Sequence, residues 1–149
     1  MQRLILVRHG EHYHTSLNNR GRAHIARLGE ALKPTINGGR ILILTSTATR
    51  ARESAEILGQ ILGVEIGQNE ILGDGNYSED MKEELDLICS NKESADVLIL
   101  VTHLEQVTAL PWIFGKEELR VNDFPCKMIN KGEAWDIDCE QKTITLISV

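Results

Sequence analysis

Three nearly unbroken runs of apolar residues constrain the fold of this 149-residue chain more than any other feature. They are RLILV at Arg3–Val7, RILILT at Arg40–Thr45 and VLILVT at Val97–Thr102. A strand with one face in water alternates apolar and polar residues, whereas a strand buried on both faces does not. The runs therefore predict buried, mainly parallel strands with helices on both faces of their sheet.

Amphipathic helices are expected between these strands. Apolar residues recur at helical spacing over residues 18–33 and 47–62, and a shorter, highly charged helix is expected over residues 79–89. A fourth helix should begin after His103, directly behind the third run. Strands and helices that alternate along a chain are typical of α/β domains.

The second of these helices has recognisable end signals. Ser46 or Thr47 is expected as its N-cap, because a hydroxyl oxygen can accept a hydrogen bond from the first turn. Gly63 is expected at its C-terminal end, and a short edge strand is expected over residues 64–66.

The C-terminal part of the sequence predicts a hairpin. EAWDIDC at Glu133–Cys139 alternates, TITLISV at Thr143–Val149 is rich in β-branched residues, and residues 140–142 suit a turn. We therefore expect an α/β fold, a three-layer α/β/α sandwich with a mostly parallel central sheet and a C-terminal β-hairpin. We expect residues 1–149 to form a single domain.

Composition and charge exclude several classes of protein. The net charge of −6 gives the chain no overall attraction for nucleic acid or for an anionic membrane surface. No apolar run approaches the roughly 18 residues of a membrane span, and we expect no secretory signal. The three cysteines are far apart and form no CxxC pair, which argues against disulfides or a zinc site and favours a cytoplasmic protein.

Charged residues follow each buried run and predict a binding site. Arg8 and His9 follow the first run, Arg50 lies shortly after the second, and His103 follows the third. Ligands of open α/β sheets bind beyond the carboxyl ends of the strands. The pattern therefore predicts a cationic pocket on an acidic protein.

A phosphate group suits such a pocket. A guanidinium can bind two phosphate oxygens at once, and Arg50 is expected in the first turn of a helix, where free N–H groups also favour anions. A histidine beside the anion is a candidate nucleophile or proton carrier. Neighbouring arginines disfavour the protonated imidazole of His9 and leave it a lone pair for attack.

Several segments resemble the histidine phosphatase superfamily, which has the phosphoglycerate mutase-like fold. LVRHGE at residues 6–11 resembles the RHG motif that opens the family pattern, and LNNRGRAHIARLGEAL at 17–32 is similar to its LTxxGxxQA segment. TSTATRARESAEIL at 45–58 is similar to SSPxxRAxQTA and aligns Arg50 with the second family arginine. LILVTHLEQV at 98–107 resembles the strand that delivers the second family histidine.

The resemblance implies a mechanism for these residues. His9 would attack phosphorus in line and become a phosphohistidine, which water then hydrolyses. Arg8, Arg50 and His103 would bind the equatorial oxygens of the transferred group. No metal and no other cofactor is implied.

The acid that protonates the leaving group is less clearly marked. In larger family members it is a glutamate, and the resemblance aligns Glu70, in NEIL, with that residue. Asp74, Glu11 and Glu105 are alternatives. A leaving group that departs easily, such as the imidazole of a phosphohistidine, depends less on an acid.

The spacing of the motifs favours one branch of the family. About fifty residues separate Arg50 from the third buried run, which leaves little room for the capping insertions of the mutases. The chain thus most resembles the small SixA-type phosphohistidine phosphatases, acting on a phosphohistidine protein or a small phosphomonoester. A mutase-like phosphotransferase and a catalytically idle phosphate- or phosphoprotein-binding module are the alternatives.

Simpler structural roles are expected for other polar and aromatic residues. Arg52 should form a surface ion pair or a secondary anion contact, and Trp135 should pack in the core. His12 and His14 should line the pocket rim or face solvent, because no nearby aspartate or cysteine completes a metal site. The acidic stretch Glu79–Asp86 is expected to be a solvated helix face.

Overall fold

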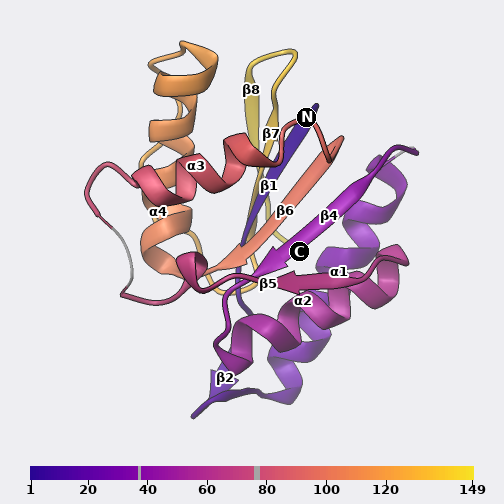
Figure 1. Cartoon of the computed structure of the whole chain (residues 1–149). Coiled ribbons are helices and arrows are strands. Elements are labelled where there is room, and N and C mark those ends of the chain that lie inside the picture. The colour runs from indigo at the N-terminus through magenta and orange to yellow at the C-terminus, as the bar shows by residue number, and fades with distance from the viewer. Residues whose placement is uncertain (37, 76–77) are drawn as a thin grey trace.

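A six-stranded sheet forms the centre of the molecule (Figure 1). The computed structural model describes residues 1–36, 38–75 and 78–149. The strands are β1 (Arg3–Arg8), β4 (Ile41–Thr45), β5 (Ile66–Gln68), β6 (Val97–Thr102), β7 (Ala134–Asp138) and β8 (Thr143–Ile147). Their order across the sheet is β5-β4-β6-β1-β7-β8. The sheet is mixed, because β1, β4, β5 and β6 are parallel while β7 and β8 form an antiparallel hairpin.

The register of the parallel strands brings their carboxyl ends together. Arg8 at the end of β1 lies opposite Thr102 at the end of β6, and Thr45 at the end of β4 lies opposite Val101 of β6. Each strand therefore delivers the residues that follow it to the same edge of the sheet.

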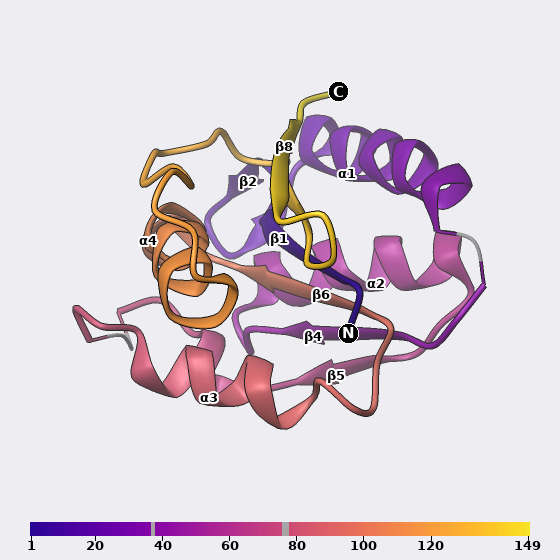
Figure 2. The ribbon, with the colours of Figure 1, turned by 90° about the horizontal axis from the view of Figure 1, so that it is seen from above.

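Two pairs of helices cover the sheet (Figure 2). The helices α1 (Asn19–Leu32) and α2 (Thr49–Leu62) pack on one face, and α3 (Lys82–Ser90) and α4 (Leu104–Phe114) lie on the other. This confirms the three-layer arrangement, the mostly parallel sheet and the C-terminal hairpin.

Burial on both faces explains why the strands do not alternate. In β1, Leu4 and Leu6 belong to the core beneath α3 and α4, while Ile5 and Val7 belong to the core beneath α1 and α2. All four are fully buried. An apolar residue is needed at each position, which gives the continuous run in the sequence.

Short elements fill the connections. A small hairpin of β2 (His12–Tyr13) and β3 (Ser16–Leu17) follows β1, and single 3-10 turns lie at η1 (Lys33–Thr35) and η2 (Glu70–Leu72). After α4 the chain continues into the π-helical turn η3 (Gly115–Leu119).

The expected ends of α2 are half correct. Gly63 closes the helix in the left-handed conformation, with φ of 74°. The expected N-cap is wrong, because Ala48 occupies that position and makes no side-chain capping bond. The Ser46 hydroxyl accepts a hydrogen bond from the Ala48 N–H at 3.1 Å, but Ser46 lies before the cap.

Two further boundaries differ from expectation. The edge strand β5 begins at Ile66 rather than at residue 64, because the Val64 N–H still donates to Gly59 O at the end of α2. The helix α3 begins at Lys82 rather than at residue 79, because Met81 has φ of 50°, which no α-helix contains.

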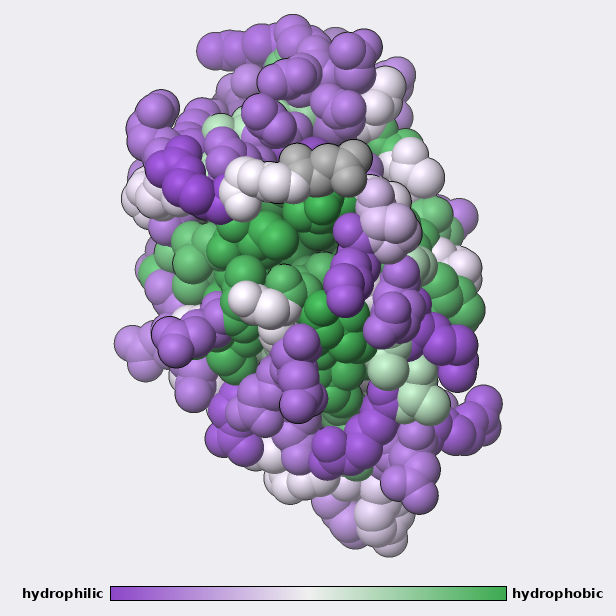
Figure 3. Space-filling view, turned by 90° about the vertical axis from the view of Figure 1, so that its right-hand side faces the viewer, coloured by the Kyte–Doolittle hydropathy of each residue, from purple (hydrophilic) through white to green (hydrophobic). Residues whose placement is uncertain are grey.

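Apolar side chains also reach the surface. Figure 3 views the molecule from the right-hand side of Figure 1 and shows such side chains gathered in the middle of this face. Partly buried apolar residues of β4, α2 and β5, including Ile41, Ile57 and Ile66, pack against the core on the α1–α2 side. Among the described residues, no helix is both long enough and apolar enough to cross a membrane.

Candidate active site

A cavity of about 240 Å³ lies at the carboxyl edge of the sheet. The described residues that line it are Arg8, His9, His12, Arg50, Asp74, His103, Leu104, Glu105 and Lys131. The cavity therefore brings together the four residues that the sequence placed after three different strands, Arg8, His9, Arg50 and His103.

The backbone fixes where these four side chains start. Arg8 ends β1 and His9 follows it, with the His9 N–H donating to Thr102 O at 3.1 Å. His103 is the N-cap of α4, and Arg50 lies in the first turn of α2. Both helices thus point their N-terminal ends, with free N–H groups, toward this edge.

The imidazole of His9 has a defined orientation. Its Nδ1 lies 3.0 Å from Gly10 O, and a carbonyl oxygen can only accept, so Nδ1 carries the proton. The lone pair of neutral His9 is therefore on Nε2, where the Arg50 Nε–H donates at 3.3 Å. Burial lowers the pKa of His9 to about 3, and the nearby His103 and Arg50 add to the effect. His9 is 4 % exposed and is neutral at physiological pH.

His103 is held in the complementary tautomer. Arg50 Nη2, which can only donate, lies 3.5 Å from His103 Nδ1, so the lone pair is on Nδ1. The Nε2–H then donates to the Ser46 hydroxyl at 2.9 Å. Burial lowers the pKa of His103 to about 4, with Arg50 as the next cause.

Arg8 is anchored from behind. Its Nη1 donates to Ile129 O at 2.8 Å, in the segment before β7. Its Nε is buried and has no hydrogen-bond partner among the described residues. Burial lowers the pKa of Arg8, and Glu105 opposes this change. The guanidinium is thus a donor group that the protein leaves partly unsatisfied at the cavity.

Of the four carboxylates considered as the acid, only Asp74 and Glu105 line the cavity. Asp74 Oδ2 accepts from Arg50 Nη2 at 3.1 Å. Glu105 Oε2 is buried without a hydrogen-bond partner in the described part of the chain. Glu70 is an exposed residue of η2 and is not among the described residues that line the cavity. Glu11 is not among them either, and its Oε1 accepts a hydrogen bond from Asn18 Nδ2 at 3.0 Å.

Two lining residues had weaker signals in the sequence. His12 was expected at the rim, and its ring centroid lies 5.2 Å from that of His9. Lys131 was missed, because it comes from the segment between η3 and β7, which has no periodic pattern to place it. His14 is exposed, with φ of 53°, and its carbonyl lies 2.9 Å from His12 Nδ1.

Two of the simpler expectations are confirmed, but the acidic stretch Glu79–Asp86 is not a fully solvated helix face, because α3 begins at Lys82 and Glu84 is buried. Arg52 pairs with Glu56 at 3.3 Å on the surface of α2. Trp135 is buried in the core beneath α3 and α4.

Comparison with known proteins places the chain among phosphatases. Residues 4–88 match the model of the histidine phosphatase superfamily (branch 1). No curated protein sequence matches.

Solved structures share the whole fold. A protein assigned as the phosphohistidine phosphatase SixA of Agrobacterium tumefaciens is 22 % identical, with a TM-score of 0.72 over 99 % of this chain and 95 % of that one. A mycobacterial glucosyl-3-phosphoglycerate phosphatase is 17 % identical, with a TM-score of 0.68 over 99 % and 98 %. The protein histidine phosphatase SixA complexed with tungstate is 16 % identical, with a TM-score of 0.70 over 97 % and 94 %.

Proposed function

This chain belongs to the histidine phosphatase superfamily (branch 1), and we propose that it is a phosphatase whose His9 becomes phosphorylated during turnover. The substrate is a phosphohistidine or a phosphomonoester, and one domain over residues 1–149 carries the activity. The proposal names His9 as nucleophile, Arg8, Arg50 and His103 as ligands of the phosphoryl group, and no metal.

The observation that carries the proposal is the tautomer of His9. The Nδ1–H is bound to Gly10 O, so the lone pair of Nε2 faces the cavity. Because the pKa is about 3, nearly every molecule has this lone pair at neutral pH. Attack of Nε2 on phosphorus forms the N–P bond while the bond to the leaving group breaks. Water then attacks phosphorus, releases phosphate and restores Nε2.

The surrounding donors stabilise the transferred group. In the free site Arg50 donates to His9 Nε2, to His103 Nδ1 and to Asp74. An entering phosphoryl group takes over these donors, together with the unsatisfied Nε–H of Arg8. The dianion also favours protonation of His103 at Nδ1, which converts that nitrogen into a donor to a phosphoryl oxygen.

Proton transfer to the leaving group falls to a cavity carboxylate. Asp74 and Glu105 line the cavity and are the candidates for this role, whereas Glu70 is not among the described lining residues and its assignment stays a prediction. Among the described residues, no group of three or more histidines, cysteines or carboxylates could hold a metal ion.

The test is phosphate release in the presence of EDTA. The purified protein is given a phosphohistidine protein and, separately, p-nitrophenyl phosphate. We expect turnover that His9→Ala abolishes and that the matched exposed variant His14→Ala retains. Activity that survives His9→Ala, or that EDTA removes, would refute the proposal. If the wild type and His9→Ala are both inactive but still bind phosphate, the chain is a phosphate-binding module.

A further inference from the structure

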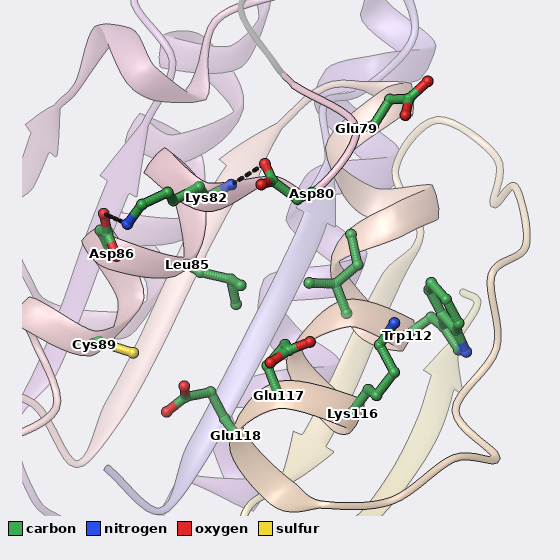
Figure 4. A pocket seen from close by; sticks show the side chains of 11 residues that line it. Glu79, Asp80, Lys82, Leu85, Asp86, Cys89, Trp112, Lys116, Glu117 and Glu118 are labelled. Atoms are coloured by element: carbon green, nitrogen blue, oxygen red, sulfur yellow. Dashed lines mark hydrogen bonds and ion pairs between the residues drawn. The ribbon is translucent and has the colours of Figure 1, made fainter.

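A second and larger cavity, about 540 Å³, forms a groove between α3 and the α4–η3 segment (Figure 4). None of the described residues that line this acidic groove also lines the active-site cavity. They are Glu79, Asp80, Lys82, Leu85, Asp86, Cys89, Trp112, Ile113, Lys116, Glu117 and Glu118. The mechanism above uses none of them.

The groove has an apolar floor. Leu85 from α3 lies between its two walls, and Trp112 stands at one end (Figure 4). Ile113 from α4 also lines the groove. Trp112 is 38 % exposed, which is unusual for so large an apolar side chain, whereas Trp135 is buried. Exposed aromatic residues in a hollow are typical of interaction sites.

The walls of the groove are acidic. They carry five carboxylates and two ammonium groups. Lys82 is already paired with Asp86 at 3.1 Å, and Glu118 is paired with Lys92. In the described part of the chain, Glu79 and Glu117 form no ion pair, and Figure 4 shows Glu117 directed toward the groove. A cationic partner is therefore the complementary one.

The Trp112 ring already holds a cation. Lys116 Nζ lies 3.8 Å from the ring centroid, within the range of a cation–π contact. Lys116 belongs to the same helical wall, so a side chain of the molecule itself occupies the place that an incoming lysine or arginine would take. The Trp112 face is thus suited to bind an ammonium or guanidinium group.

We propose that the acidic groove docks a basic segment of a protein substrate, with an apolar side chain on Leu85 and Ile113 and a cation beside Trp112 and Glu117. This inference rests on the proposed phosphatase function and assigns its substrate to the phosphoproteins. A second copy of this acidic chain is a poor occupant, because like charges repel across an interface.

The helix α4 connects the two sites. It starts directly after His103, its first residues line the active-site cavity, and its last turn carries Trp112 and Ile113. Its 11 residues span about 16 Å at 1.5 Å each. An extended peptide covers that distance with about five residues at 3.3 Å each. A substrate can therefore place a phosphohistidine in the active site and a basic segment in the acidic groove at the same time. The two parts must be about five residues apart in an extended chain, or equally far apart on a folded protein.

The binding test uses two synthetic peptides of equal length. One alternates lysine with leucine and alanine, and the other has glutamate in place of each lysine. Titration is followed by tryptophan fluorescence, to which the exposed Trp112 responds, and by calorimetry. We expect the basic peptide alone to bind, with affinity that falls as salt is added. Glu117→Lys should weaken binding about tenfold. The matched control is Glu30→Lys, a charge reversal at an exposed position of α1 in the opposite layer.

The kinetic test separates docking from chemistry. Glu117→Lys and Trp112→Ala should raise KM about tenfold for a phosphohistidine peptide with lysines about five residues away. Both variants should leave kcat and the hydrolysis of p-nitrophenyl phosphate unchanged. The docking proposal would be overturned if the basic and acidic peptides bound equally well, or if Glu117→Lys and Glu30→Lys changed binding equally. It would also be overturned if the protein formed a dimer that Glu117→Lys dissociates. Loss of turnover on both substrates in the wild type would instead overturn the proposed function.

Discussion

Replacing Ser46 by alanine tests how the structure controls His103. Ser46 is fully buried, and its hydroxyl accepts from His103 Nε2 at 2.9 Å and from the Ala48 N–H at 3.1 Å. The hydroxyl thereby holds the proton on Nε2 and leaves Nδ1 for the phosphoryl group. We expect Ser46→Ala to weaken transition-state binding by making the doubly protonated imidazole less favourable.

The size of the effect follows from one buried hydrogen bond to a cation. Such a bond contributes about 1.5–3 kcal/mol, and its loss leaves the buried N–H of His103 without this partner. Since 1.36 kcal/mol corresponds to a factor of ten, kcat should fall about ten- to hundredfold. In the substrate complex the pKa of His103 should fall by one to two units. The alkaline limb of the kcat profile should therefore move to lower pH by about that amount.

The assay is the pH profile of kcat for p-nitrophenyl phosphate, with thermal unfolding measured alongside. The control is Thr45→Val. Thr45 is equally buried and its hydroxyl donates to Ser46 O at 3.1 Å, so its loss should cost stability but leave the profile in place. If Ser46→Ala and Thr45→Val lose the same stability and neither moves the alkaline limb, the role assigned to Ser46 is wrong.

Three further predictions concern charge. Asp74→Asn should raise the affinity for inorganic phosphate several-fold, as measured by calorimetry, because the Asp74 carboxylate competes with the anion for Arg50. Unchanged affinity would mean that the Arg50–Asp74 ion pair does not compete with phosphate. Acidification from pH 6.5 toward pH 4 should destabilise the fold, because burial lowers the pKa of His9 to about 3 and of His103 to about 4 and the unfolded chain binds more protons there. The loss, seen in denaturant titrations without phosphate, should be smaller in His9→Gln. Glu84→Met should stabilise by about 1–2 kcal/mol, more at pH 8 than at pH 5, because the carboxylate of Glu84 is buried and burial raises its pKa. A stability gain that is independent of pH would contradict this reason.

The sequence predicts the sheet well because burial on both faces leaves a direct pattern. Short runs such as Leu4–Val7 are typical of strands buried on both faces, and the residues that follow parallel strands meet at one edge. This is why Arg8, His9, Arg50 and His103 could be brought together before their contacts were known.

Other features depend on contacts that no local pattern records. Ser46 has the chemistry of an N-cap, but its hydroxyl also accepts from His103, which is distant in sequence. Glu70 is aligned with the family acid only through the short match NEIL, and it lies exposed in the 3-10 turn η2. Lys131 reaches the cavity on a segment without periodicity. The acidic stretch Glu79–Asp86 was expected only to be solvated, yet it forms one wall of the acidic groove.

The most direct test of the account is to identify the phosphorylated atom during turnover. The enzyme is mixed with radiolabelled substrate, quenched in alkali, where phosphohistidine survives, digested and analysed by mass spectrometry and phosphorus NMR. The structure predicts one acid-labile phosphoryl group on His9, attached to Nε2, because Nδ1 is bound to Gly10 O. Label on Nδ1, label on another residue, or turnover without any labelled enzyme would contradict the central claim.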